Sequence, residues 1–155
     1  MERRADISWE GALEGGIGTI WGASGSLRQL LVNSPSRTQS SGGWTNPEEL
    51  LAAAHASSYA MALARTLAER GAAIQRFDAS STFTVDERGT TITAVRLGVL
   101  GNVGGVDDAA FAEAAEAAVG SCQISTLLKA TAEITVEAAR RDYRLAIPAT
   151  SEPAA

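Results

Sequence analysis

The sequence predicts an α+β fold with two antiparallel sheets, one before and one after a long central helix. Three observations support this class: apolar and polar residues alternate before residue 33, a helical pattern spans residues 47–70, and alternation returns after residue 77. In chain order the elements are three strands, a helix, two strands, two helices and a last strand. Because strands and helices do not alternate one by one, this order indicates α+β rather than βαβ.

The first three predicted strands form an N-terminal sheet. Residues 5–10 and 17–21 alternate as half-buried strands do, and residues 27–31 suggest a third strand. Turn residues separate the three segments, which favours an antiparallel meander. Residues 33–44 then form a polar loop whose one charged residue is Arg37.

The central helix is the stretch around which the rest of the chain is organised. Asn46 can cap it, Pro47 is tolerated at the first helical position, and Gly71 is placed to end it. Between residues 50 and 64 the only side chain that is charged or titrates near neutral pH is His55. A helix that is apolar on all sides is buried on all sides, so we expect another helix to pack closely against its alanines.

The second half of the chain predicts another antiparallel sheet and two further helices. In order, these are strands at residues 77–86 and 95–99, a loop at 101–105, helices at 107–119 and 122–129, and a strand at 132–138. We expect a single domain over residues 1–144 and a disordered tail at residues 145–155.

Composition and charge exclude several classes of function. The net charge of −5 and the pI of about 4.9 argue against nucleic acid or an anionic membrane as partner. No run reaches the roughly 18 apolar residues of a membrane span, and the N-terminus lacks the apolar core of a signal peptide. One cysteine cannot form an intrachain disulfide, so we expect a cytoplasmic location. One histidine and one cysteine cannot build a typical zinc site, so no metal is expected.

The most specific motif of the chain is TNPEELLAAAHASSYAMAL at residues 45–63. It resembles the central helix of the OsmC/Ohr family of osmotically inducible protein C-like hydroperoxide reductases, OsmC subgroup. In that family the helix typically reads TNPEEL, AAHA, a cysteine, an aromatic residue and MAL. The family's peroxide-attacking cysteine falls on Ser58. The resemblance implies an OsmC-like fold, an intertwined homodimer with the long helices buried inside, and active sites at the subunit interface.

The resemblance also implies a set of site residues. The segment GSCQISTLLKA at residues 120–130 is similar to the family's GCPVSxxLKA, with one residue inserted and Gln123 in place of the proline. This places Cys122 at the position of the resolving cysteine. Arg37 fits the arginine that holds the attacking cysteine as a thiolate, and Glu48 fits the carboxylate that orients this arginine.

The resemblance further implies a substrate pocket for organic hydroperoxides. Three residues would form it: His55, Trp44 and Tyr59. Ordinary structural roles are alternatives: a core histidine, core aromatics, a packed cysteine at 122, a solvated loop arginine at 37 and a first-turn acid at 48. A serine hydrolase using Ser58 and His55 is disfavoured, because no acid is placed to orient the imidazole.

Ser58 decides what the resemblance implies for activity. A serine hydroxyl is scarcely ionised near neutral pH and forms no sulfenic acid, so the chain as written should lack thiol peroxidase activity. Either natural loss or a Cys→Ser substitution accounts for it. The predicted function is that of an OsmC-type hydroperoxide reductase in oxidative or osmotic stress defence, using an external dithiol or lipoyl-type reductant and no bound cofactor. The alternative is a non-catalytic dimer of the same fold that binds a small ligand.

Overall fold

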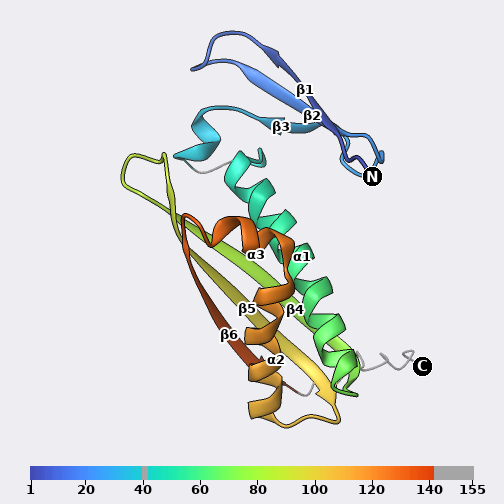
Figure 1. Cartoon of the computed structure of the whole chain (residues 1–155). Coiled ribbons are helices and arrows are strands. Elements are labelled where there is room, and N and C mark those ends of the chain that lie inside the picture. Colours follow the sequence, from blue (N-terminus) through green and yellow to red (C-terminus); the bar gives the residue numbers. More distant parts are fainter. Residues whose placement is uncertain (40–41, 142–155) are drawn as a thin grey trace, which may run out of the picture.

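The computed structural model describes residues 1–39 and 42–141, so the predicted tail at residues 145–155 lies outside the described residues. Figure 1 shows a small N-terminal sheet at one end of a long helix, and a larger sheet with helices packed on one face. The elements are β1 (Ala5–Glu10), β2 (Ile17–Gly22), β3 (Leu30–Val32), the 3-10 helix η1 (Pro35–Arg37), α1 (Pro47–Glu69), β4 (Ala73–Val85), β5 (Ile92–Gly104), α2 (Asp108–Ser121), α3 (Gln123–Leu128) and β6 (Glu133–Arg140).

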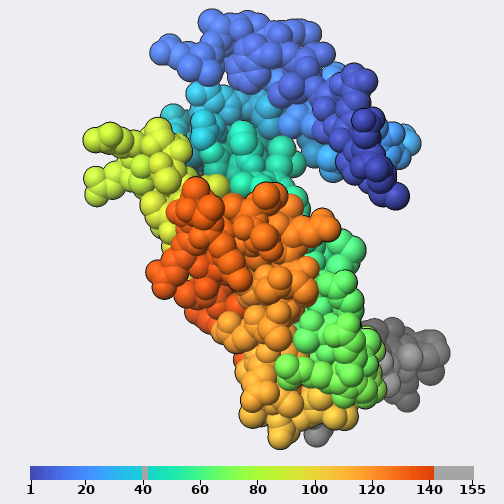
Figure 2. All heavy atoms as spheres, in the orientation of Figure 1, coloured from blue at the N-terminus to red at the C-terminus, as the bar shows by residue number. Residues whose placement is uncertain are grey.

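The N-terminal sheet is the antiparallel meander that the alternation predicts, in the order β1-β2-β3. Its third strand begins later than predicted, at Leu30, because Gln29 adopts a positive φ of 52° that an extended strand does not allow. The sheet projects from the rest of the molecule (Figure 2), and large apolar side chains such as Ile7 (57% exposed) and Trp9 (43%) remain uncovered. Among the described residues, this sheet therefore has no complete hydrophobic core.

Helix α1 begins and ends where the sequence predicts. The Asn46 side chain accepts a hydrogen bond from the Glu49 backbone N–H at 2.7 Å, and Gly71, with a φ of 73°, follows the end of the helix. One face of α1 is buried in the core, whereas Met61 on the other face is 68% exposed. The described part of the chain thus does not bury α1 on all sides, contrary to what the sequence had led us to expect.

The second sheet, in the order β4-β5-β6, differs from the prediction in its strand directions. β4 and β5 form the predicted antiparallel hairpin, but β6 pairs with β5 in parallel, so the sheet is mixed. The reason is the connection: α2 and α3 cross over the sheet between the two strands, and a crossover of this kind returns the chain in the same direction.

The predicted loop at residues 101–105 is largely the end of β5, which extends to Gly104. The glycine at 101 has a packing role there. A Cβ on Gly101 would lie 2.7 Å from Cζ of Phe111, which is fully buried on α2. The missing side chain therefore allows α2 to pack directly on the strand.

The main core lies between the second sheet and the helices. Its fully buried apolar side chains come from α1, β5 and α2, and include Tyr59, Leu63, Leu67, Leu97, Val103, Phe111, Ala114, Ala115 and Ala118. Across the described residues, no helix is both long enough and apolar enough to cross a membrane.

We predict that Gly101→Ala lowers the free energy of unfolding by about 1–3 kcal/mol, because the added methyl overpacks the Phe111 ring. Gly120→Ala is the control: Gly120 is exposed on α2 with open space around its Cβ position, so alanine should leave stability unchanged or raise it by up to about 1 kcal/mol. Urea denaturation of both variants measures the difference. A Gly101→Ala midpoint equal to that of the unsubstituted chain would contradict this packing argument.

Candidate functional site

The candidate site is centred on a contact between Ser58 and Cys122, which lie 64 residues apart in the chain. Ser58 is on α1, and Cys122 forms the junction between α2 and α3 and caps the start of α3. The Cys122 thiol donates to Ser58 Oγ at 3.3 Å, and its sulfur accepts from the Ser125 backbone N–H at 3.5 Å. The fold thus brings together the two positions that the resemblance assigns to the attacking and resolving cysteines.

The environment of Cys122 acts on its thiol in two opposing ways. Burial opposes ionisation, since the side chain is almost completely buried. When the thiol ionises, the sulfur can accept hydrogen bonds from Ser125 and Ser58, and these outweigh burial, so the pKa of Cys122 is held below its ordinary value. The contact with Ser58 therefore influences the sulfur even though position 58 carries no thiol.

His55 is fully buried and is not paired with Ser58. Its Nδ1 lies 3.0 Å from the Ser81 hydroxyl on β4, and its Nε2 lies 2.8 Å from the Ser125 hydroxyl on α3. The ring also stacks on Phe83, with ring centroids 6.0 Å apart. Burial lowers the pKa of His55, which favours the neutral imidazole. With both nitrogens bonded to these hydroxyls, His55 is not arranged to activate Ser58 as a nucleophile.

The two aromatic residues of the predicted substrate pocket differ in position. Tyr59 is fully buried, its hydroxyl donates to the Ala115 carbonyl at 2.8 Å, and burial raises its pKa. Tyr59 and His55 expose no surface, so neither lines an open cavity of the single chain. Trp44 is half-buried just before α1, and its place in a substrate pocket stays a prediction.

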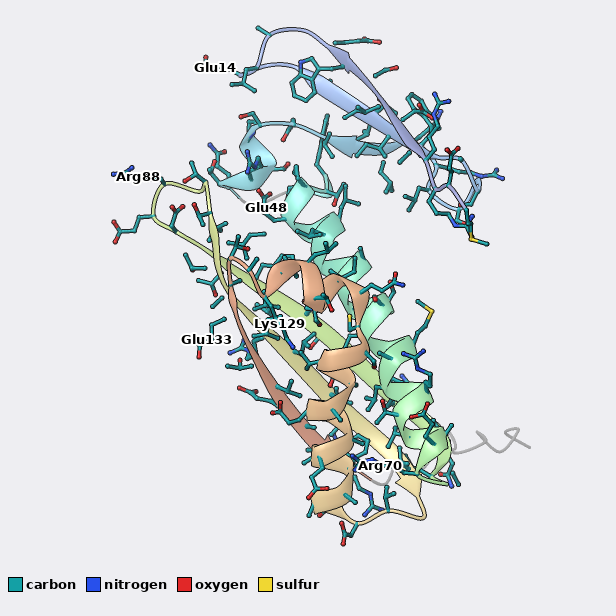
Figure 3. The ribbon with its side chains drawn as sticks, in the orientation of Figure 1. Glu14, Glu48, Arg70, Arg88, Lys129 and Glu133 are labelled. Atoms are coloured by element: carbon teal, nitrogen blue, oxygen red, sulfur yellow. The ribbon has the colours of Figure 1, made fainter. Side chains whose placement is uncertain are left out.

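Arg37 and Glu48 form a bidentate ion pair at the start of α1. Arg37 Nε donates to Glu48 Oε1 at 3.0 Å, and Arg37 Nη2 contacts the same oxygen. The hydrogen bond from Arg37 is the main reason that the pKa of Glu48 is lowered. Figure 3 shows Glu48 in the first turn of α1, facing the loop that carries η1.

The loop that carries Arg37 is fixed by buried polar contacts. The Ser36 hydroxyl is buried and lies 2.8 Å from the carbonyl oxygens of both Asn33 and Thr45. The Asn46 side chain caps α1 with its oxygen and donates to the Ser36 carbonyl with its nitrogen at 3.0 Å. The residues that begin the helix therefore also position Arg37.

Within one chain the ion pair does not reach Ser58. Glu48 precedes Ser58 by ten residues on the same helix, which separates their Cα atoms by about 15 Å along the axis. The two places also open onto different cavities: one of about 330 Å³ beside Arg37 and Glu48, and one of about 250 Å³ beside Ser58. The fold joins Arg37 to Glu48 and Ser58 to Cys122, but it does not join the two pairs.

The sequence reasoning missed three polar residues of this region: Ser81, Ser125 and Arg65. Arg65 follows Ser58 by seven residues, which is two helical turns, and both line the cavity beside Ser58. That spacing could have identified it. Ser81 gave no signal, because its contact with His55 depends on how β4 packs against α1.

Comparison with known proteins places the chain among sequences similar to OsmC. Residues 40–137 match the family model described as OsmC-like protein. Over 147 residues the chain is 34% identical to the protein named Peroxiredoxin OsmC from Escherichia coli (strain K12), an alignment that covers 94% of this chain and 97% of that relative.

Solved structures share the fold at lower sequence identity. An organic hydroperoxide resistance protein from Elizabethkingia anophelis superimposes with a TM-score of 0.70 at 18% identity, covering 91% of this chain and 97% of that one. The organic hydroperoxide resistance protein OsmC from Legionella pneumophila gives 0.69 at 16% identity, with 90% and 97% covered. OhrB of Bacillus subtilis gives 0.60 at 22% identity, with 87% and 97% covered. The α+β fold class is confirmed.

We predict that the free energy of unfolding falls as the pH drops below about 6.5, the ordinary pKa of histidine. Burial lowers the pKa of His55 in the folded chain, so in this range the unfolded chain binds a proton that the folded chain does not. The stability from neutral His55 is present above the unfolded pKa and is lost as the pH falls toward the lower folded pKa. Denaturant titrations between about pH 7.5 and 5 measure this slope, above the range in which carboxylates titrate.

His55→Gln tests the assignment, because His55 is the only histidine in the chain. The variant should lose most of the slope and be less stable at pH 7.5 by about 1–3 kcal/mol, since Ser81 and Ser125 lose a matched partner. An unchanged slope in His55→Gln would assign the pH dependence to another group.

Proposed function

The chain belongs to the OsmC-like protein family, and from that premise we propose that it has the framework of a thiol-dependent organic hydroperoxide reductase with Ser58 in place of the attacking cysteine. The homology to Peroxiredoxin OsmC supports a hydroperoxide-reductase-like function. The observation that carries the finer proposal is the 3.3 Å contact between Ser58 Oγ and Cys122 Sγ. Two cysteines at such positions would be close enough to form a disulfide after small adjustments.

The proposed chemistry requires a thiolate at position 58. The thiolate attacks the terminal oxygen of the hydroperoxide, the O–O bond breaks, an alcohol leaves after protonation, and a cysteine sulfenic acid remains. The Cys122 thiol then displaces water from this sulfenic acid to give a disulfide, which a dithiol reduces. Ser58 cannot begin the sequence, because its hydroxyl is not ionised near neutral pH. The chain as written should therefore be inactive.

Cys122 does not replace the missing thiol. Its side chain is almost completely buried, and Arg37 is held by Glu48 at the start of α1, away from the sulfur. A peroxide would need access to the sulfur and a cation to stabilise the charge that develops on the leaving oxygen. Burial withholds the first condition from Cys122, and Arg37 does not supply the second within one chain.

We also propose that the functional unit is a homodimer. Between the N-terminal sheet and the exposed face of α1 lies an apolar cavity of about 580 Å³, lined by Ile7, Ile20, Leu27, Leu50 and Ala54 among others. Small residues on this face of α1 permit a second helix to approach closely. A twofold contact near Ala53, midway between Glu48 and Ser58, would bring Glu48 and Arg37 of one copy to Ser58 of the other.

The proposal also includes an external dithiol or lipoyl-type reductant and no bound cofactor. It includes a cytoplasmic location, because a chain with one cysteine forms no intrachain disulfide.

Binding without turnover is the second candidate function, and Ser58 itself favours it. A hydroxyl keeps the pocket polar and unreactive, so a small molecule could bind beside it without being reduced.

We predict that the unsubstituted chain reduces cumene hydroperoxide negligibly with a dithiol, and that Ser58→Cys raises the rate by roughly a hundredfold or more, since the thiolate is the attacking species. The exchange is nearly isosteric, so it should change stability by less than about 1.5 kcal/mol. Peroxide treatment of this variant should give a disulfide to Cys122 that is detectable by mass.

Ser57→Cys is the matched control, because Ser57 is the exposed neighbour on the same helix and its hydroxyl bonds the Ala54 carbonyl. It should neither restore turnover nor form the disulfide. A folded Ser58→Cys protein without activity would favour the binding function, and activity of the unsubstituted chain would identify Cys122 as the nucleophile.

The dimer proposal predicts a particle of about twice the 16.0 kDa chain mass in light scattering at micromolar concentration. Ala54→Glu should dissociate it, because a carboxylate would be buried at the α1 contact. Ala117→Glu, the same change at an exposed position of α2, should leave the mass unchanged. A monodisperse 16.0 kDa species for the unsubstituted chain would contradict the dimer.

A further inference from the structure

The buried imidazole of His55 has no part in the chemistry proposed for position 58, yet both of its nitrogens are bonded. Nδ1 lies 3.0 Å from the Ser81 hydroxyl, and Nε2 lies 2.8 Å from the Ser125 hydroxyl. Burial lowers the pKa of His55, so the neutral ring offers one donor and one acceptor, which two hydroxyls satisfy in either tautomer. Because a buried polar group is costly unless its hydrogen bonds are made, these two contacts fix where the ring lies.

His55 and Ser58 face Cys122 and Ser125 as two matched pairs. The residues of each pair are three positions apart in the chain, so His55 and Ser58 are neighbours on one face of α1. Three contacts connect the pairs: His55 with the Ser125 hydroxyl, the Ser125 backbone N–H with the Cys122 sulfur at 3.5 Å, and the Cys122 thiol with Ser58 Oγ at 3.3 Å. With α1 these contacts form a closed ring, so a displacement of Ser125 displaces Cys122 relative to position 58.

Helix α3 depends on its contacts with the rest of the fold, because its six residues are too few for a helix that is stable alone. Cys122 directly precedes α3, and Ser125 is fully buried in its first turn. Within residues 1–39 and 42–141, the bond between Ser125 and His55 is the only hydrogen bond from an α3 side chain to another helix or strand. Ile124 and Leu128 add apolar packing. The turn that carries Cys122 is therefore oriented by His55.

We infer that His55 is a positioning residue for the second step of the proposed reaction: through Ser125 it keeps the Cys122 sulfur directed at position 58. This role rests on the proposed function, in which a thiolate at position 58 first becomes a sulfenic acid. The Cys122 thiolate then attacks the sulfur of that acid. An S–S bond forms, the S–O bond breaks, and the oxygen leaves as hydroxide and is protonated to water. Neither ring nitrogen is bonded to Ser58 or Cys122, so His55 acts through Ser125 alone.

The two steps of the reaction should depend on His55 to different extents. The first step needs a thiolate at position 58 and a cation for the leaving oxygen, and His55 supplies neither. The second step needs the Cys122 sulfur within reach of the sulfenic acid and in line with its S–O bond. A misplacement of about 1 Å can slow a reaction by up to about a hundredfold. Loss of the contact between His55 and Ser125 should therefore slow disulfide formation and leave peroxide attack nearly unchanged.

The test compares two serine substitutions in the full chain carrying Ser58→Cys. Ser125→Ala removes the hydroxyl on the side of His55 that leads to Cys122, and Ser81→Ala makes the same change on the other side. Each leaves one ring nitrogen without its partner, so both should lower the urea midpoint to a similar extent. After peroxide treatment, Ser125→Ala should form the disulfide more slowly by roughly tenfold or more, and Ser81→Ala by less than about threefold. Trapping with dimedone measures the sulfenic acid, whose formation should change by less than about threefold in both.

His55→Asn is a second variant that tests the same contact if Ser125→Ala does not fold. Asparagine carries its polar atoms at the δ position, on the side of Ser81, so Ser125 loses its partner. This variant should slow disulfide formation to the same extent as Ser125→Ala. Disulfide formation at the unsubstituted rate in folded His55→Asn would show that His55 does not position Cys122.

A redox buffer of oxidised and reduced dithiothreitol separates this role from the proposed function. It forms the same disulfide by thiol–disulfide exchange and needs no peroxide, and the equilibrium constant measures how well the two thiols are aligned. Ser125→Ala should lower this constant by roughly tenfold, and Ser81→Ala by less than about threefold. Inactivity of Ser58→Cys toward peroxide would contradict the proposed function and leave this comparison intact. Equal constants in the two serine variants would overturn the role of His55, as would an equal slowing of both reaction steps by Ser125→Ala.

Discussion

The buried imidazole of His55 is the interaction on which the geometry of this site depends. It links three elements at one point: α1, which carries it, β4 through Ser81, and α3 through Ser125. A buried polar network of this kind is stable only when each member has a partner, and here both ring nitrogens do. Because the Ser125 backbone N–H also bonds to Cys122, the same network sets the distance between Cys122 and Ser58.

A second constraint is the incomplete burial of α1. Its inner face packs in the core beneath α2 and against β4, but within residues 1–39 and 42–141 its outer face and the apolar face of the N-terminal sheet have no cover. Ser58 lies between these two environments: it contacts the buried Cys122 on one side and lines an open cavity on the other. The position therefore contacts the core on one side and faces the cavity on the other.

The sequence predicted most of the fold because its strongest signals are local. The Asn46 cap, the glycine at 71 that ends α1 and the alternating hairpin strands each depend on residues within a few positions, and all three are present. The parallel pairing of β6 could not be predicted in the same way, because it depends on where the crossover helices place the chain. The late start of β3 was missed because the positive φ of Gln29 has no clear sequence signal.

In the candidate site, too, contacts between residues far apart in the chain could not be predicted from local sequence patterns. The pairing of Arg37 with Glu48 and the proximity of Ser58 to Cys122 were reached through the family resemblance, since no periodicity connects residues so far apart. The partners of His55 were missed because a serine on a strand or a short helix gives no sign of facing a buried imidazole. Arg65 lies seven residues after Ser58, a spacing of two helical turns that places both on one face of α1.

The geometry of the site and its reactivity rest on different atoms. The groups that fix position 58 are the His55 network, the Cys122 junction and the packing of α1, and none of them requires a thiol at that position. The Ser58 oxygen accepts the hydrogen bond from Cys122, and this contact fixes the geometry between the two positions. The fold and the contact between positions 58 and 122 therefore depend on packing and hydrogen bonds, whereas the proposed chemistry depends on one atom at position 58.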